Sequence, residues 1–342
     1  MGSVGSLMTI DLRGYVESAR NIVAYHALSP GAYRRWNWQD RDGTRDLSVN
    51  PYGCADAANI LYTIGYFPSG LEERVSWIAA LQSLQNPETG LFEEATHHTI
   101  HTSAHCIAAL ELFDAKPLHK LTGLRTYANP EELRHFLSGL DWRGNPWRES
   151  HRGAGLFAAM VIADEVDLAW QDAYFDWLWQ NTDLETGLLA GKSLPRVTHS
   201  GTTTMVPHMA GTFHYLFNMQ WARRPSRYPE RLIDACLTMY QERQFPLGQR
   251  IGFAEIDWFY CMNRSLRQCN HRFEESRAAI EALGQELAEY VLALDPETDD
   301  GLNDLHALFG NLCAFAELQQ ALPGLVVTDR PMKLVLDRRP FI

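Results

Sequence analysis

Apolar residues recur at helical spacing between Trp77 and Phe113, with one sharp interruption. The first half predicts a helix that ends near Gln85, because a breaker sequence, residues 86–90 (NPETG), follows it. The second apolar run begins at Thr102 and is almost uncharged, so we expect a helix that is buried on most sides. This stretch therefore predicts two helices joined by a turn and a polar loop.

The same turn occurs again further along the chain. Close copies follow other apolar helical runs at residues 183–188 (DLETGL) and 295–302 (DPETDDGL), and weaker copies stand at residues 143–147 and 244–248. From Gly90 to Gly301 the copies give a period of about 53 residues, which is in the range of repeat architectures. A hairpin of two helices with its loops fills such a period.

The repeat consists of an outer helix, a turn with G-L-F, a loop with H-T, and an inner helix with a run such as residues 105–110 (HCIAAL). It resembles the repeat of the terpenoid cyclase and protein prenyltransferase superfamily. The resemblance covers roughly residues 50–322 and implies an all-α fold, an (α/α) toroid of about five to six helical hairpins around a central cavity. This toroid is also similar to six-hairpin glycosidases, polysaccharide lyases and uronate epimerases, so the fold alone does not choose a substrate.

The repeat favours one closed unit over residues 50–322, although 342 residues would suffice for two domains. Residues 1–49 predict a helix from Leu12 to Ala27, followed by an Arg/Trp-rich loop that packs on the ring. This loop is either a lid or a wall of the site. Residues 323–342 predict an extended tail that lies across the ring.

Composition excludes several classes of partner. The net charge is −12 and no cluster of Lys and Arg is present, so neither a nucleic acid nor an anionic membrane is an expected partner. The six cysteines form no CxxC pair and most lie in apolar helical runs, as expected for buried thiols in a reducing compartment. No segment has 18 uninterrupted apolar residues, so we expect a cytoplasmic protein with no membrane span.

Ionisable and aromatic side chains gather at the predicted starts of the inner helices. In a toroid these starts lie at one end, so we expect the side chains to surround one cavity. The catalytic candidates are Glu255, Asp257, His208, Asp304 and His105. The candidates for substrate binding are Arg152, Trp258, Tyr52, Asp56, Tyr215 and His306.

A carboxylate acid with a carboxylate or histidine base suits hydrolysis, elimination or epimerisation of a sugar. Glu255 and Asp257 stand about 200° apart on a continuous helix, so only one of them reaches the cavity and its partner comes from another repeat. Glu255 suits a cap on its own helix equally well. Arg152 would hold a carboxylate or phosphate of the ligand, and Trp258 would stack on a sugar ring.

No cofactor is predicted, with a divalent metal as the alternative. His97, His101 and His105 are spaced by four, so His101 and His105 are candidate metal ligands on one helix face, although ordinary hydrogen-bonded histidines are favoured. Protein prenyltransferases use zinc held by Asp, Cys and His. The similar Asp234-Ala235-Cys236 falls on a predicted outer helix, and the D-x-D-D acid of related terpene cyclases is absent.

The polarity of the inner-helix starts favours an enzyme that acts on a polar, uronate-like carbohydrate, either a small molecule or an oligosaccharide. A hydrocarbon cyclase would need an aromatic wall with one acid, whereas this chain offers several histidines, acids and an arginine. An isoprenoid-acting enzyme, similar to terpene cyclases or prenyltransferases, is the first alternative. A non-catalytic toroid that binds a protein or peptide is the second.

Overall fold

The helices of the chain alternate between two types of burial. In the computed structural model, which describes residues 9–189, 204–244, 248 and 250–342, every residue from Ile100 to Leu110 of helix α4 is buried. Helix α5 instead buries one face, made by Leu133, Phe136 and Leu137. Helices that are apolar on all sides lie inside a protein, and amphipathic helices lie on its outside. The chain therefore alternates outer and inner helices.

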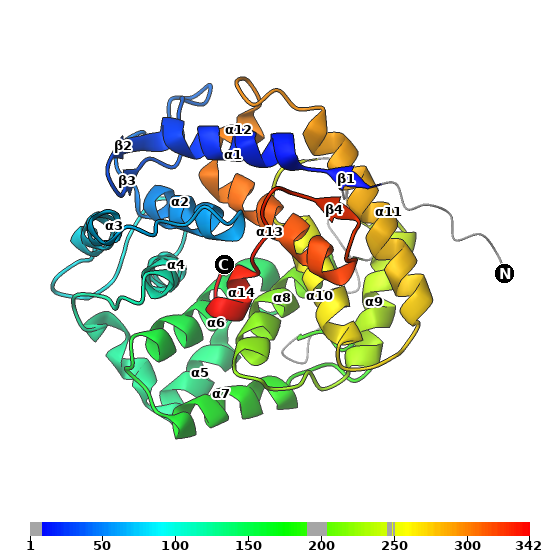
Figure 1. Cartoon of the computed structure of the whole chain (residues 1–342). Coiled ribbons are helices and arrows are strands. Elements are labelled where there is room, and N and C mark those ends of the chain that lie inside the picture. Colours follow the sequence, from blue (N-terminus) through cyan, green and yellow to red (C-terminus); the bar gives the residue numbers. More distant parts are fainter. Residues whose placement is uncertain (1–8, 190–203, 245–247, 249) are drawn as a thin grey trace.

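Within the described residues six inner helices follow six outer ones. The inner helices are α2 (Pro51–Thr63), α4 (Thr99–Leu112), α6 (Pro146–Ile162), α8 (Val206–Trp221), α10 (Ala254–Leu266) and α13 (Leu305–Ala321). The outer helices are α1 (Arg13–His26), α3 (Leu71–Ser83), α5 (Pro130–Gly139), α7 (Leu168–Gln180), α9 (Pro229–Gln241) and α11 (Phe273–Leu292). Each inner helix packs against the next, and α13 packs back against α2, so these contacts form a closed circle (Figure 1).

The remaining elements are short. They are the 3-10 helix η1 (Thr122–Ala128), helices α12 (Asp300–Asn303) and α14 (Val335–Arg338), and strands β1 (Ile10–Asp11), β2 (Ala27–Ser29), β3 (Ala32–Tyr33) and β4 (Val326–Val327). Strand β1 pairs in parallel with β4, and β2 pairs antiparallel with β3. The tail beyond residue 322 therefore differs from the extended segment that we expected, because it contains α14. No helix in the described ranges is long and apolar enough to cross a membrane.

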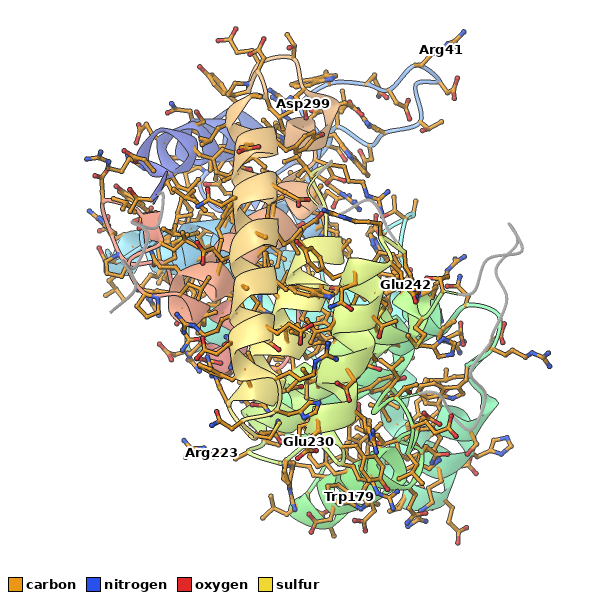
Figure 2. The ribbon with its side chains drawn as sticks, turned by 90° about the vertical axis from the view of Figure 1, so that its right-hand side faces the viewer. Arg41, Trp179, Arg223, Glu230, Glu242 and Asp299 are labelled. Carbon is orange, nitrogen blue, oxygen red and sulfur yellow. The ribbon has the colours of Figure 1, made fainter. Side chains whose placement is uncertain are left out.

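The outer helices α9 and α11 run in the same direction. Figure 2 shows them side by side, running from the end marked by Arg223 and Glu230 to the end marked by Glu242 and Asp299. The loop with Arg41 lies at this second end. The inner helices α10 and α13, which follow α9 and α11 after a loop, therefore start at this second end.

The first two copies of the repeated turn have the same hydrogen bonds. Asn86 Oδ1 accepts from the N–H groups two and three residues later (2.9 and 3.1 Å), and Asp183 Oδ1 does the same (3.1 and 2.8 Å). Gly90 and Gly187 close these turns with φ of +72° and +71°. The third copy differs, because Asp299 stands at the glycine position with φ of −73° and caps α12. The repeat in the sequence is thus a repeat in structure at two of its three close copies.

We predict that Gly90→Ala destabilises the protein by clearly more than about 1 kcal/mol, which is the usual cost of a left-handed alanine. An added Cβ would stand 2.0 Å from the Lys120 carbonyl oxygen, a backbone atom that cannot rotate away. Gly43→Ala is the matched control, because Gly43 has φ of +68° with nothing within 4 Å of its Cβ position. Urea unfolding of both variants measures the difference in stability. Equal losses in the free energy of unfolding would show that the backbone around Gly90 moves away from the added Cβ without cost.

Candidate functional site

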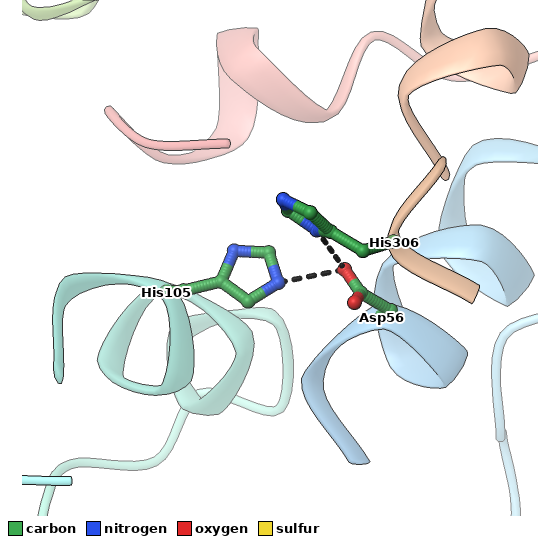
Figure 3. Close-up of side chains that lie close together, drawn as sticks. All are labelled: Asp56, His105 and His306. Carbon is green, nitrogen blue, oxygen red and sulfur yellow. Dashed lines mark hydrogen bonds and ion pairs between the residues drawn. The ribbon is translucent and has the colours of Figure 1, made fainter. Parts of the chain in front are cut away.

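Three side chains from three inner helices meet at one carboxylate. Asp56 of α2 accepts hydrogen bonds at its Oδ1 atom from His105 Nε2 of α4 (2.7 Å) and from His306 Nδ1 of α13 (3.2 Å) (Figure 3). These helices are neighbours because α2 packs between α4 and α13. Asp56 and His105 are fully buried, and the His306 side chain is 9% exposed. We call these three residues the Asp56 group.

Charge in this group resides on the carboxylate. Burial by itself would raise the pKa of Asp56, but His306 and His105 outweigh it and hold that pKa well below its usual range. Burial lowers the pKa of His105, and it lowers the pKa of His306 to about 4 although Asp56 opposes the shift. At neutral pH the group is therefore one carboxylate with two uncharged imidazoles.

The hydrogen bonds fix the tautomer of each ring. A carboxylate only accepts, so His105 carries its proton on Nε2 and His306 carries its proton on Nδ1. The other nitrogen of each ring then has a free lone pair. His105 Nδ1 is buried and has no hydrogen-bond partner among the described residues. The group thus offers two oriented bases, which is the arrangement that proton transfer requires.

Further aromatic side chains extend this centre. The ring of Tyr52 stacks on His97 and His105 at 4.4 and 4.8 Å between centroids, and its hydroxyl is hydrogen-bonded to His101 Nδ1. His151 of α6 lies 4.4 Å from His101, and it contacts His214 of α8 at 4.8 Å. Burial lowers the pKa of His101 and His151 far below the usual range, and that of His214 to about 3. The interior is therefore lined by uncharged imidazoles at pH 7.

The Arg/Trp-rich loop is bonded to the start of α13 and to the segment ahead of α4. Arg35 is 6% exposed and forms a two-bond ion pair with Asp304 at 2.8 Å for each bond. Its Nη1 atom also donates to Thr96 ahead of α4, and its guanidinium carbon lies 5.1 Å from the Tyr52 ring. Asp304 caps α13 by accepting from the His306 N–H. The loop is thus attached to the same helix ends that carry the Asp56 group.

Residues 339–342 approach the centre of the circle, where Figure 1 places the C-terminal end. The Pro340 carbonyl accepts from Asn218 Nδ2 of α8 at 2.8 Å. Phe341 is fully buried with its ring 5.0 Å from His101, and Arg339 donates to Asn59 Oδ1 one turn beyond Asp56. Side chains of this segment therefore belong to the central site.

The structure brings together some of the candidates from the sequence. Tyr52, Asp56, His105 and His306 lie in one cluster, and Asp304 is adjacent through its bond to the His306 backbone. His101, a candidate metal ligand, contacts Tyr52 and is not part of the Asp56 group. These residues come from repeats that are far apart in sequence, as expected for inner-helix starts.

Glu255, Asp257 and Trp258 of α10 do not contact this cluster through any bond among the described residues. Glu255 Oε1 accepts from the Gly248 N–H at 2.8 Å, and Trp258 Nε1 donates to the Cys236 carbonyl of the outer helix α9 at 2.9 Å. Asp257 is fully buried, and burial raises its pKa well above the usual range with a further increase from Glu255. The catalytic roles expected for Glu255 and Asp257 stay predictions, because neither carboxyl is bonded to the Asp56 group among the described residues.

Three other candidates contact neighbouring elements. Arg152 pairs with Glu149 at 3.0 Å and lies over the Phe136 ring of the outer helix α5 at 5.5 Å. The Tyr215 ring stacks 5.3 Å from that of Trp142. His208 Nε2 is 3.0 Å from the Trp142 carbonyl oxygen.

From the sequence, His151 was placed with Arg152 at an inner-helix start but only Arg152 was chosen as a candidate, and His214, directly beside the candidate Tyr215, was missed. Adjacent residues on a helix point about 100° apart, so a one-position error exchanges an inward side chain for an outward one. Arg35 stood in a loop that we expected to be a lid or wall. Arg339 carried no sequence signal, because the tail has no repeat that would place it.

The Asp56 group has a donor set suited to a divalent cation. One carboxylate oxygen and two imidazole nitrogens, each from a different residue, lie within 4.8 Å of one another, and carboxylate with imidazole is a common ligand set for Zn²⁺ and Fe²⁺. A bound cation would take the place of the two hydrogen-bond protons. His105 Nδ1 lacks the hydrogen-bond partner that usually orients a metal-bound histidine.

We predict that the stability of the protein decreases as the pH falls from about 6.5 to about 4. In this window the unfolded chain takes up protons on histidines whose pKa is lowered in the folded state, so protonation favours unfolding. Five histidines of the centre act this way: His101, His105, His151, His214 and His306. Glu255 and Asp257, with raised pKa, act in the opposite direction but are fewer.

Each proton that the unfolded chain binds in excess of the folded chain changes the free energy of unfolding by about 1.4 kcal/mol per pH unit. Urea unfolding at several pH values between 7 and 4 measures the slope. His135→Ala is the control, because His135 is exposed and its removal should leave the slope unchanged. A free energy of unfolding that stays constant or rises on acidification would contradict the burial of neutral imidazoles.

No protein-family model, curated protein or solved structure matches this chain.

Proposed function

We propose that this protein is an enzyme that moves protons on a polar, carbohydrate-like small molecule at the centre of an (α/α) toroid. His105 and His306 act as the proton-transferring residues, and Asp56 positions them. The observation that carries the proposal is the buried Asp56 carboxylate, which orients two uncharged imidazoles from different helices. The closed circle of contacts among the inner helices supports the toroid.

Two bases on one carboxylate suit abstraction and return of a proton better than they suit hydrolysis. A two-carboxylate glycosidase mechanism needs an acid and a second carboxylate on either side of the bond. The buried acids Glu255 and Asp257 are not bonded to the Asp56 group in the described part of the chain. Epimerisation or elimination, in which an uncharged imidazole removes a proton and the imidazolium so formed gives it back to the product or the leaving group, therefore fits these residues best.

The lining of the centre supports a polar ligand over an isoprenoid. Imidazole nitrogens, the Asp56 carboxylate and the Tyr52 hydroxyl all converge there, and each forms directional hydrogen bonds. A hydrocarbon would leave Asp56 Oδ2 and His105 Nδ1, which have no partner among the described residues, unsatisfied at about 1–3 kcal/mol for each group. A sugar supplies both donors and acceptors.

Solvent exchange tests the proposal directly. Full-length protein in D₂O is incubated with a panel of aldoses and hexuronic acids, and ¹H NMR follows loss of the C–H signal next to the carbonyl. We expect enzyme-dependent exchange for at least one member, with no exchange in heat-denatured protein. Absence of exchange and of any other conversion across the panel, together with turnover of an isoprenoid diphosphate, would refute the proposal.

A divalent cation at the Asp56 group is a second candidate, favoured by the convergence of its three donor atoms within 4.8 Å. In that case Asp56, His105 and His306 would hold the cation, which would supply Lewis-acid chemistry when bound. Exchange measured after dialysis against EDTA, and again after addition of Zn²⁺ or Mn²⁺, separates the two cases. Full activity in EDTA is expected for the imidazole bases, whereas activity that returns only with metal would assign the group to a cation.

A further inference from the structure

The Arg339 side chain is buried with most of its hydrogen-bonding capacity unused. It is 0% exposed, and its Nη2 atom donates to Asn59 Oδ1 of α2. Its Nε and Nη1 atoms have no hydrogen-bond partner, and Arg339 forms no ion pair among the described residues. Burial lowers the pKa of Arg339 to about 10, so the guanidinium is still charged at pH 7.

Other unpaired polar atoms occur in the same part of the molecule. Asn59 lies one turn beyond Asp56 on α2, and its Nδ2 atom has no partner in the part of the chain that the structure describes. The same is true of Asp56 Oδ2 and His105 Nδ1. Arg339 is bonded to Asn59, Asn59 lies one turn from Asp56, and Asp56 is bonded to His105, so the four residues lie in one neighbourhood. This neighbourhood thus presents both unpaired donors and unpaired acceptors.

A buried charge with unused donors is costly unless a partner meets it. The Asp56 carboxylate already accepts from two histidines at Oδ1, and no bond joins it to Arg339 among the described residues. The other arginine of the centre, Arg35, is satisfied by Asp304. The guanidinium of Arg339 is therefore a positive group beside the proposed proton-transferring residues, and no anion of the described residues is bonded to it.

We propose that Arg339 binds the anionic group, a carboxylate or a phosphate, of the small molecule that the central site takes. The inference rests on the proposed function, because it assigns the substrate class of that same site. The ligand is then a sugar acid or a sugar phosphate. Its charged end lies against Arg339 and Asn59, and its hydroxyl groups reach Asp56 and His105.

Calorimetric titration of the full chain tests this inference without relying on turnover. The probes are glucuronate, glucose 6-phosphate and glucose at constant ionic strength, and they separate a carboxylate, a phosphate and a neutral sugar. We expect one of the two anions to bind and glucose to bind at least about tenfold more weakly. Arg339→Gln should weaken binding of that anion by about 10- to 100-fold, the usual range for a lost charge-assisted hydrogen bond.

Arg338→Gln is the matched control. The Arg338 side chain, next to Arg339 in the sequence, is 33% exposed and pairs with Glu111 and Asp114 away from the centre. Binding in this variant should equal that of the unmodified protein. If Arg339→Gln fails to fold, Arg339→Lys takes its place, because lysine retains the positive charge. Independently of both variants, histidine ¹H–¹⁵N NMR of the unmodified protein must show that the anion raises the pKa of His105.

The inference is overturned if neither anion binds the unmodified protein, or if Arg339→Gln binds an anion as tightly as the Arg338→Gln control does. These results differ from failure of the proposed function. Anion binding that depends on Arg339 without proton exchange would refute the acid–base reaction alone. Proton exchange on neutral sugars with no effect of anions would refute only the role of Arg339.

Discussion

Asp56→Asn is expected to slow proton exchange by about 100- to 10,000-fold, the range in which positioned acids and bases contribute to catalysis. An amide keeps one acceptor oxygen but loses the negative charge, and its NH₂ group can no longer accept from an imidazole. His105 and His306 both donate to the one oxygen Oδ1, and an uncharged amide oxygen holds these two N–H groups, and therefore the two tautomers, less firmly than a carboxylate does. The exchange rate measured by NMR in D₂O gives the effect.

The pH profile separates this role from a purely structural one. Asp56 raises the pKa of His306 against the effect of burial, so the acid limb of the exchange rate should move to lower pH in Asp56→Asn. Asp172→Asn is the control, because this carboxylate of the outer helix α7 is 55% exposed and pairs with Arg224. An exchange rate in Asp56→Asn within a factor of two or so of the unmodified protein would contradict the positioning role.

Glu317→Gln is expected to lower the free energy of unfolding by about 3–5 kcal/mol. Arg264 of α10 and Glu317 of α13 form a two-bond ion pair at 2.8 and 2.9 Å, and both side chains are 2% exposed. Removal of the carboxylate charge leaves the buried guanidinium with one partner, Asp337, at the surface. Urea unfolding followed by circular dichroism measures the loss.

Two further variants interpret this result. Asp337→Asn should cost less than about 1 kcal/mol, because partly exposed ion pairs contribute little. The double variant Arg264→Met with Glu317→Leu should recover much of the loss, since apolar residues of similar volume remove the uncompensated charge. A loss for Glu317→Gln as small as that for Asp337→Asn would show that water reaches the pair.

Because Asp337 is on α14, the same contacts hold the segment that carries Arg339 and Phe341.

The sequence alone indicated the alternation of outer and inner helices. Apolar residues on all sides of the segment after Thr102 predict burial, and the breaker at residues 86–90 predicts the turn. The structure shifts the start of that helix to Thr99, because His98 accepts from the Ile100 N–H and caps it. The convergence of Tyr52, Asp56, His105 and His306 also followed from the sequence, since each is near an inner-helix start.

Tertiary structure decided which of these polar residues share a site. The direction of a helical side chain depends on the rotation of its helix against its neighbours, and residue types carry little of that information. His151 is therefore in the centre while Arg152 pairs with Glu149, and Glu255 bonds to Gly248 instead of to Asp56. Arg339 has no periodic pattern around it, so only the packing of the tail against α2 and α8 brings its charge to the Asp56 group.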